Sequence, residues 1–417
     1  MTSARPAAKD DARSLSATAS KSGLTVAYFA GWLIDGTGKT PAAQDILMRV
    51  ENGLIASLER VNLSELKGPG RPDVYEYSGC TILPGLIDCH VHLTMSGKTD
   101  PELRSRQLEY DFAQNSPLIC KRLEKVLALG IMAVRDGGDI GGHTLTYVKQ
   151  GRPSRVRVKC AGRGWRAPGR YGKLIARVPE NGSTLAESIK ANCDGADHIK
   201  IVNSGLNSLN EFGLETPPQF DRDELEAAFR EARKLGRKVM VHANGRLPVK
   251  GALDAGGDSI EHGFFMGEEN MKRMADRQVV WVPTAFAMKA LRTHLPAGGI
   301  QSEVAAKILE AQLEQMSRAR ELGVALAAGT DAGGFGLLHG EALAEELKLM
   351  VEAGFSVEEA VGCATSAGAR LLGLDREFGR LGLGMPANFI VVNGPPSSLP
   401  DSLGKVKAVY LRGEKIN

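Results

Sequence analysis

Between Pro84 and about Leu374 the sequence alternates short apolar runs, rich in β-branched residues, with longer amphipathic stretches. Eight of the runs have the character of strands: LIDCHVHL, GIMAVRDGG, SRVRVKCAG, HIKIVNSG, KVMVHANG, SIEHG, VVWVPT and VALAAGTDAG. Strands that alternate with amphipathic helices are typical of a parallel sheet built from βα units. The pattern therefore predicts an α/β fold in which residues 83–375 form a (β/α)8 barrel, also called a TIM barrel.

Two of the intervening stretches open with a signal for the start of a helix. Asp221-x-x-Glu224 precedes LEAAFREARKL, and Ser356-x-x-Glu359 precedes AVGCATSAGARLL. Both resemble the capping box, in which the side chains of the first and fourth residues bind each other's backbone N–H groups. We therefore expect helices to begin at these two positions.

The segments that flank the predicted barrel have a different texture. Short alternating runs separated by turns extend from Leu24 to about Tyr77, and Asn52-Gly53 between DILMRV and LIASLERV is a strong hairpin signal. A similar texture returns near the C-terminus in NFIVVNGPP and VKAVYLRGEKI. We expect residues 23–82 and 376–417 to form one small β-sandwich domain, and residues 1–22 to be a disordered N-terminal segment.

Composition excludes several classes of partner. The chain has 417 residues, with 52 Lys and Arg against 49 Asp and Glu. This balance lacks the basic excess of a nucleic-acid-binding protein. No stretch is apolar over the roughly 18 residues that a membrane span needs, residues 1–22 lack the core of a secretory signal, and the six cysteines are scattered singly. We expect a cytoplasmic homo-oligomer with a small-molecule substrate, without nucleic-acid or membrane partners.

Several candidate metal ligands fall near the carboxyl ends of the predicted strands. His90 and His92 are two residues apart in one strand, so their side chains point to the same side. That spacing alone is weak evidence. Four further candidates lie at the same expected rim, where barrel enzymes assemble their active sites: Lys200, His242, His262 and Asp331. Their convergence predicts a metal site rather than independent core residues.

These motifs resemble those of the amidohydrolase superfamily. PGLIDCHVHL, the lysine of the fourth strand, two later single histidines and GTDAG occur in the order typical of that superfamily. IDGTGKTPAAQDILMRVENGLIASL near the start and LGLGMPANFIVVNGPP near the end agree with it, so the resemblance extends from about Leu24 to Asn417. The sequence is most similar to the binuclear branch that contains imidazolonepropionase-like proteins, Xaa-Pro and Xaa-Arg dipeptidases and ochratoxin-hydrolysing amidases.

The resemblance implies a cofactor of two divalent metal ions, for which we expect zinc. His90, His92 and Asp331 would bind the more buried ion. His242 and His262 would bind the more exposed one. Lys200, carboxylated on its side-chain nitrogen by carbon dioxide, would bridge the two ions with two anionic oxygens.

The implied reaction is hydrolysis of an amide-type C–N bond in an N-acyl amino acid or a dipeptide-like substrate. The two ions would share a water and lower its pKa, so that hydroxide attacks the carbonyl near neutral pH. Asp331 would be the catalytic proton shuttle. Hydrolysis of a carbamate, urea or lactone, deamination of a heterocycle, and a non-catalytic scaffold homologue are the alternatives. The presence of Lys200 argues against a mononuclear deaminase, and the complete ligand set argues against a scaffold.

A cationic segment follows the third predicted strand. AGRGWRAPGRYGKLI contains Arg163, Arg166, Arg170 and Tyr171, which suit a substrate that carries a carboxylate. A solvated charged loop is the alternative. Many relatives carry Gly-Gly-His here, and its absence from this sequence argues against dipeptidase specificity.

Other polar residues near the expected site have structural alternatives. His339 either orients a metal ligand, or binds substrate, or caps the helix that follows it. His198 is two residues before Lys200, and we expect a buried core histidine rather than a seventh ligand. Arg135 and Asp136 end the second strand, where we expect an ion pair between neighbouring loops rather than contact with substrate.

Overall fold

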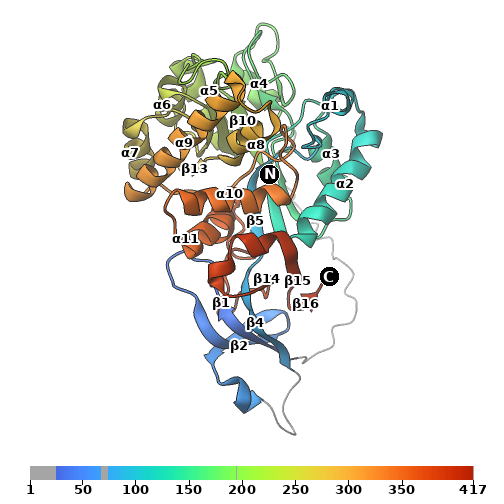
Figure 1. Cartoon of the computed structure of the whole chain (residues 1–417). Helices are drawn as coiled ribbons and strands as arrows, with labels where there is room; N and C mark the ends of the chain where they lie inside the picture. Colours follow the sequence, from blue (N-terminus) through green and yellow to red (C-terminus); the bar gives the residue numbers. More distant parts are fainter. Residues whose placement is uncertain (1–24, 67–73, 194, 417) are drawn as a thin grey trace, which may run out of the picture.

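A seven-stranded sheet at one end of the molecule joins strands from both ends of the chain (Figure 1). The computed structural model describes residues 25–66, 74–193 and 195–416, so the predicted disorder of residues 1–22 lies outside the described residues. The strand order is β16-β15-β14-β4-β1-β2-β3. Its members are β1 Thr25–Leu33, β2 Ala43–Glu51, β3 Leu54–Arg60, β4 Val74–Pro84, β14 Phe389–Asn393, β15 Val406–Leu411 and β16 Glu414–Lys415. The division of the chain into domains stays a prediction.

The predicted hairpin at Asn52-Gly53 is confirmed. These residues connect β2 to β3, which pair in antiparallel fashion, and their φ angles are 53° and 78°. Two successive positive φ values define the tight turn whose twist matches that of the flanking strands, and Asn and Gly are the residues that tolerate them.

Two parallel sheets form the centre of the chain. One has the order β5-β6-β7, and the other has the order β13-β12-β11-β10-β8-β9. The bounds are β5 Leu86–Val91, β6 Ile131–Asp136, β7 Arg157–Cys160, β8 Gly164–Trp165, β9 Ala176–Arg177, β10 His198–Val202, β11 Lys238–Ala243, β12 Ser259–His262 and β13 Val280–Val282. Seven of the eight predicted strands therefore form. The short strand β8 lies within the cationic segment that follows the third predicted strand, and β9 begins directly after that segment.

The eighth predicted strand, VALAAGTDAG, does not form a continuous strand. The segment 324–333 makes only isolated parallel bridges, from Leu326 to Trp281 of β13 and from Ala332 to Val91 of β5. Its ladder is interrupted because Asp331 adopts a φ of 58° and Gly333 a φ of 105°. The segment nevertheless lies between the two parallel sheets, since it is bridged to one strand of each.

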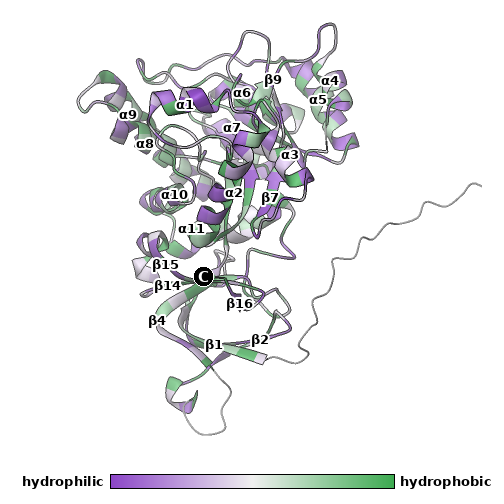
Figure 2. Ribbon diagram, turned by 90° about the vertical axis from the view of Figure 1, so that its right-hand side faces the viewer, coloured by the Kyte–Doolittle hydropathy of each residue, from purple (hydrophilic) through white to green (hydrophobic). Residues whose placement is uncertain are grey.

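Helices follow most of the parallel strands and cover their outer faces (Figure 1). They show both hydrophilic and hydrophobic residues, as amphipathic helices do (Figure 2). Their bounds are α1 Pro101–Gln107, α2 Phe112–Ala128, α3 His143–Lys149, α4 Leu185–Ala191, α5 Arg222–Lys234, α6 Arg246–Ala255, α7 Glu268–Arg277, α8 Phe286–His294, α9 Ile300–Glu321, α10 Glu341–Glu352, α11 Val357–Gly362 and α12 Gly368–Leu372. Among the described helices, none combines the length and the apolar character needed to cross a membrane.

Both predicted helix starts are confirmed. Asp221 is the N-cap of α5, and its side chain accepts a hydrogen bond from the backbone N–H of Glu224. Ser356 and Glu359 form the full capping box at the start of α11.

Candidate metal centre

The carboxyl end of β5 brings two histidines to one carboxylate. His90 and His92 are both buried, and their Nε2 atoms lie 3.5 and 3.3 Å from Oδ1 of Asp331. Ligand atoms of these three residues all fall within 4.8 Å of one another. The spacing is that of donors around a single small cation.

The polar contacts of the two rings, a hydrogen bond of His92 and a close approach of His90 to a carboxylate, indicate which nitrogen carries the proton. His92 Nδ1 lies 2.8 Å from the carbonyl oxygen of Gly138, which can only accept, and His90 Nδ1 lies 3.0 Å from Oε2 of Glu261. In the neutral rings each Nε2 atom is therefore unprotonated and carries a lone pair. Lone pairs that face a carboxylate repel it unless a cation lies between them, so these residues fit a metal ion.

A proton competes with the metal for the same position. Burial lowers the pKa of His90 to about 4, which keeps that ring neutral and able to bind a metal. Burial also acts to lower the pKa of His92, but the contact with Asp331 outweighs it, and the pKa is raised. Asp331 itself is stabilised as the anion, because its histidine neighbours lower its pKa despite burial.

Two more histidines extend the cluster from β11 and β12. The ring centroids of His242 and His262 are 4.6 Å apart, and that of His262 is 5.0 Å from His90. His242 Nε2 lies 3.2 Å from the carbonyl oxygen of Gly205, and His262 Nδ1 lies 2.7 Å from the hydroxyl of Thr284. Each ring thus has one nitrogen held by the protein, while His242 Nδ1 and His262 Nε2 have no hydrogen-bond partner among the described residues.

Lys200 lies among these histidines on β10. It is 1% exposed, and its Nζ makes no hydrogen bond within the described part of the chain. Burial lowers its pKa to about 8, and its charge in turn lowers the pKa values of His90 and His242. A buried ammonium without a partner is costly, whereas a neutral amine can react with carbon dioxide and become an anionic ligand.

Two of the candidate ligands have a left-handed backbone conformation. His262 has a φ of 68° and Asp331 a φ of 58°, values that residues other than Gly adopt uncommonly. Because His262 leaves the extended conformation, it and the preceding Glu261 both reach the interior, although successive strand residues normally point to opposite sides. This backbone conformation brings side chains to the interior that a regular strand would point to opposite sides.

A buried polar network of Glu261, Arg135 and Ser259 contacts Nδ1 of His90, the nitrogen that faces away from Asp331. Glu261 Oε1 accepts hydrogen bonds from Arg135 Nη2 at 2.7 Å and from the Ser259 hydroxyl at 2.6 Å, while Oε2 faces His90. Arg135 also donates to the backbone oxygen of Cys89 and to Ser259. Glu261 was not predicted from the sequence, although Ser259 and Glu261 alternate in SIEHG as two inward-facing residues would.

The network corrects the prediction for Arg135 and Asp136. Arg135 does form an ion pair, but inside the parallel strands with Glu261 and not between surface loops. Asp136 instead accepts from the backbone N–H groups of Leu93 and Gly138. It therefore fixes the backbone that follows each of the first two parallel strands.

The segment after the third strand reaches the cluster through Tyr171. Its ring centroid lies 5.4 Å from that of His242. Arg166 donates to three backbone oxygens of its own segment, and Arg170 donates to the backbone oxygen of Pro217. Arg163 is exposed. The contacts of Arg166 and Arg170 hold the segment in place, and a substrate contact of any of these residues stays a prediction.

His339 and His198 lie outside the cluster. His339 is buried and its Nε2 lies 2.9 Å from the backbone oxygen of Met95, three residues after His92. Its Nδ1 has no hydrogen-bond partner among the described residues, so neither ring nitrogen binds the start of α10, and the alternative that His339 caps this helix is wrong. His198 is buried, as predicted.

Residues 81–416 match the Amidohydrolase family. The chain belongs to the amidohydrolase family. Like the family, it is a hydrolase that acts on carbon–nitrogen bonds. The resemblance inferred from the sequence motifs is confirmed by this match and by the relatives described next.

Three amidohydrolase relatives are representative. An imidazolonepropionase of Polaromonas sp. (strain JS666) is 26% identical over 76% of this chain and 76% of its own length. The crystal structure of a Xaa-Pro dipeptidase with bound methionine in the active site has a TM-score of 0.78 and 27% identity, and the match covers 94% of this chain and all of that one. The structure of ochratoxinase from A. niger, at 19% identity and a TM-score of 0.76, covers 95% of this chain and 96% of that one, and it shows the fold alone.

Proposed function

We propose that this amidohydrolase cleaves the amide-type C–N bond of an N-acyl amino acid or a dipeptide-like substrate at a metal centre. The observation that carries the proposal is the convergence of the His90 and His92 lone pairs on the Asp331 carboxylate. Such an arrangement is unfavourable without a cation. The names of the relatives, an imidazolonepropionase and a Xaa-Pro dipeptidase among them, agree with hydrolysis of a C–N bond.

We further propose that the two parallel sheets close into a (β/α)8 barrel. Segment 324–333 is bridged to β13 on one side and to β5 on the other. At the opposite junction, the backbone N–H of Asp197, just before β10, donates to the oxygen of Cys160 at the end of β7. In a closed barrel, all candidate ligands would share the carboxyl-end rim.

The donor sets fit two ions. His90 Nε2, His92 Nε2 and Asp331 would hold the first, and His242 Nδ1 with His262 Nε2 would hold the second. Lys200, if carboxylated, would supply one oxygen to each ion. Imidazole with a few anionic oxygens suits zinc, and related divalent ions are accepted by the same donors.

Bound at this site, divalent ions lower the pKa of water and polarise a carbonyl oxygen. Asp331 would move the proton, and its exposure supports this role, because its side chain is 27% exposed whereas those of the two histidines beside it are nearly inaccessible. Its carboxylate would accept a proton on the solvent side and return it to the departing nitrogen. Tyr171 would lie against the substrate next to His242.

The test combines metal analysis with a hydrolysis screen over N-acyl amino acids, dipeptides, ureas and lactones. We expect about two metals per chain and turnover of the first two substrate classes. Asp331→Asn should lower kcat by about 10²–10⁴-fold, the usual contribution of a positioned acid–base group, because an amide cannot accept and return the proton. Full activity of metal-free protein, or normal turnover by the variant, would contradict the proposal.

A further inference from the structure

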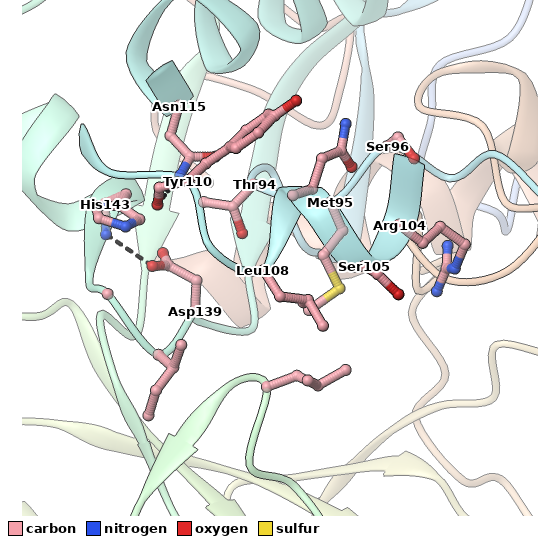
Figure 3. A pocket seen from close by; sticks show the side chains of 14 residues that line it. Thr94, Met95, Ser96, Arg104, Ser105, Leu108, Tyr110, Asn115, Asp139 and His143 are labelled. Atoms are coloured by element: carbon pink, nitrogen blue, oxygen red, sulfur yellow. Dashed lines mark hydrogen bonds between the residues drawn. The ribbon is translucent and has the colours of Figure 1, made fainter. Parts of the chain in front are cut away.

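A cavity of about 150 Å³ lies between segments that follow the first two parallel strands, and Figure 3 shows the side chains that line it. One wall continues from β5, because Thr94 and Met95 come directly after the segment that holds His92. Another begins at Asp139, next to Gly138, whose carbonyl oxygen accepts from His92. The cavity is therefore built on the two segments that position the same metal ligand.

Arg104 of α1 is the cation of this cavity. Its Nη1 donates at 3.2 Å to the backbone oxygens of Lys98 and of Gly333, two residues after Asp331. Within the described ranges, no protein group accepts from its Nε or Nη2. Arg104 is partly buried, so these N–H groups lie where an anionic ligand would be little screened by water.

The rest of the lining is both apolar and polar. Leu108, Ile140 and Leu174 line the cavity although they are 45%, 41% and 37% exposed, and polar residues such as Ser105 and Asn115 line it as well. Met95 lies between Leu108 and Arg104 (Figure 3). Exposed apolar side chains gathered around one opening are typical of a surface that a ligand covers. The one carboxylate in the lining, Asp139, accepts from the backbone at the start of α3 and is fully engaged there.

We propose that this cavity binds the hydrophobic side chain of an N-acyl amino acid substrate while Arg104 binds its carboxylate. The inference rests on the proposed function and names its substrate class. In such a substrate the carboxylate is two bonds from the scissile nitrogen, so its cation must lie close to the metal centre. Arg104 meets this condition through its contact with the backbone oxygen of Gly333, two residues after Asp331.

The first test compares N-acetyl-L-leucine with its neutral carboxamide. Arg104→Gln should reduce kcat/KM for the acid by about 10- to 100-fold, mainly through KM, because it removes a charged hydrogen-bond partner. The carboxamide should change little. Arg106→Gln, an exposed arginine on the same helix, is the matched control and should leave both substrates unaffected. Equal losses for acid and carboxamide, or a selective loss in Arg163→Gln instead, would overturn the proposal.

The second test narrows the cavity. Ile140→Trp should fill it from the exposed rim and reduce kcat/KM for N-acetyl-L-leucine much more than for N-acetylglycine, which has no side chain to place. An equal reduction for the two substrates would mean that the cavity does not receive the side chain.

A binding measurement separates this inference from the proposed reaction. Calorimetric titration of N-acetyl-L-leucine into chelated, metal-free protein should show binding that Arg104→Gln weakens and Arg106→Gln does not. If this binding occurs without hydrolysis by the metal-loaded enzyme, the proposed function fails and the cavity assignment stands. If hydrolysis occurs but neither rate nor binding depends on Arg104, only the cavity assignment fails.

Discussion

At the residue scale, each histidine of the centre has one nitrogen held by the protein and one that faces the cluster. For His90 the partner is Glu261, and Glu261 is itself held by Arg135 and Ser259. Burial raises the pKa of Glu261, but Arg135 and His90 lower it well below its usual range, so the group remains an anion. A carboxylate at this position keeps the proton on Nδ1 and directs the Nε2 lone pair at the metal.

Glu261→Gln should therefore weaken metal binding without removing a ligand. We expect metal affinity to fall by about 10- to 100-fold, as is usual when the hydrogen-bond partner of a ligating histidine is lost. Competition with a chelator, followed by metal analysis, measures the change. Glu215→Gln, on a partly exposed carboxylate that pairs with Arg246, serves as the control. Unchanged metal affinity in Glu261→Gln would show that His90 does not depend on this partner.

Lys200→Ala should lose metal and activity together. Without a bridging anion, two cations close together repel each other, and the ion near His242 and His262 should leave first. Because alanine leaves space where the lysine stood, added acetate or formate should partly restore both metal content and turnover, while chloride should not. Lys190→Ala, on the exposed surface of α4, controls for the loss of a lysine. Two retained ions and an unchanged rate in Lys200→Ala would rule out the bridge.

The sequence predicted the members of the cluster better than the groups that support it. His90, His92 and Asp331 were predicted as ligands, because their residue types and their positions at strand ends could be read directly. Glu261 and Arg104 were not, because their roles depend on which side chains they meet. Arg104 lies on α1, outside the strand ends that supply the candidate ligands, and reaches Gly333 only through the packing of α1.

At the element scale, the ends of strands determine which side chains fit beside the centre. Gly137 directly follows β6, and a Cβ atom there would lie 2.8 Å from Cε1 of His92 and 3.2 Å from Nε2 of His90. Any side chain would enter the space in which the two histidines meet the ion. The turn after β6 therefore requires glycine for close approach and not for a special φ angle.

Gly137→Ala tests this requirement. The added methyl group should displace the His92 ring and lower metal affinity by on the order of tenfold or more, while the fold persists because the backbone conformation suits alanine. Metal content would measure the loss of metal binding, and circular dichroism would show that the fold is retained. Gly79→Ala, where a Cβ meets open space, is the control. Normal metal binding in Gly137→Ala would mean that His92 tolerates a shift of its ring.

The eighth predicted strand shows where periodicity misleads. VALAAGTDAG has the apolar composition of a buried strand, and the segment is indeed buried and bridged on both sides. Regular pairing is lost because Asp331 turns out of the extended conformation towards the cluster. The position of Asp331 at the cluster thus overrides the propensity of the run to form a strand. The composition of the run does not reveal the positive φ angle.

At the scale of the whole molecule, the candidate ligands connect distant parts of the chain. They come from β5, β10, β11, β12 and the segment before Gly333, so they span residues 90 to 331. Unfolding would separate them, and an ion bound by the cluster would therefore bind the folded chain in preference to the unfolded one. Metal binding and stability should be linked.

Chelation should thus lower the melting temperature and abolish activity in parallel. An ion present at about 100 times its Kd stabilises the folded state by about 2.7 kcal/mol, and this stabilisation is lost when the ion is removed. Melting temperature from scanning calorimetry and activity, measured on the same samples, should fall together as the chelator concentration increases. Added zinc, cobalt or manganese should restore both. Lys200→Ala, which lacks the bridge, should show a smaller fall in melting temperature on chelation. If activity disappeared while the melting temperature of the wild-type chain stayed constant, the ion required for turnover would lie outside this cluster.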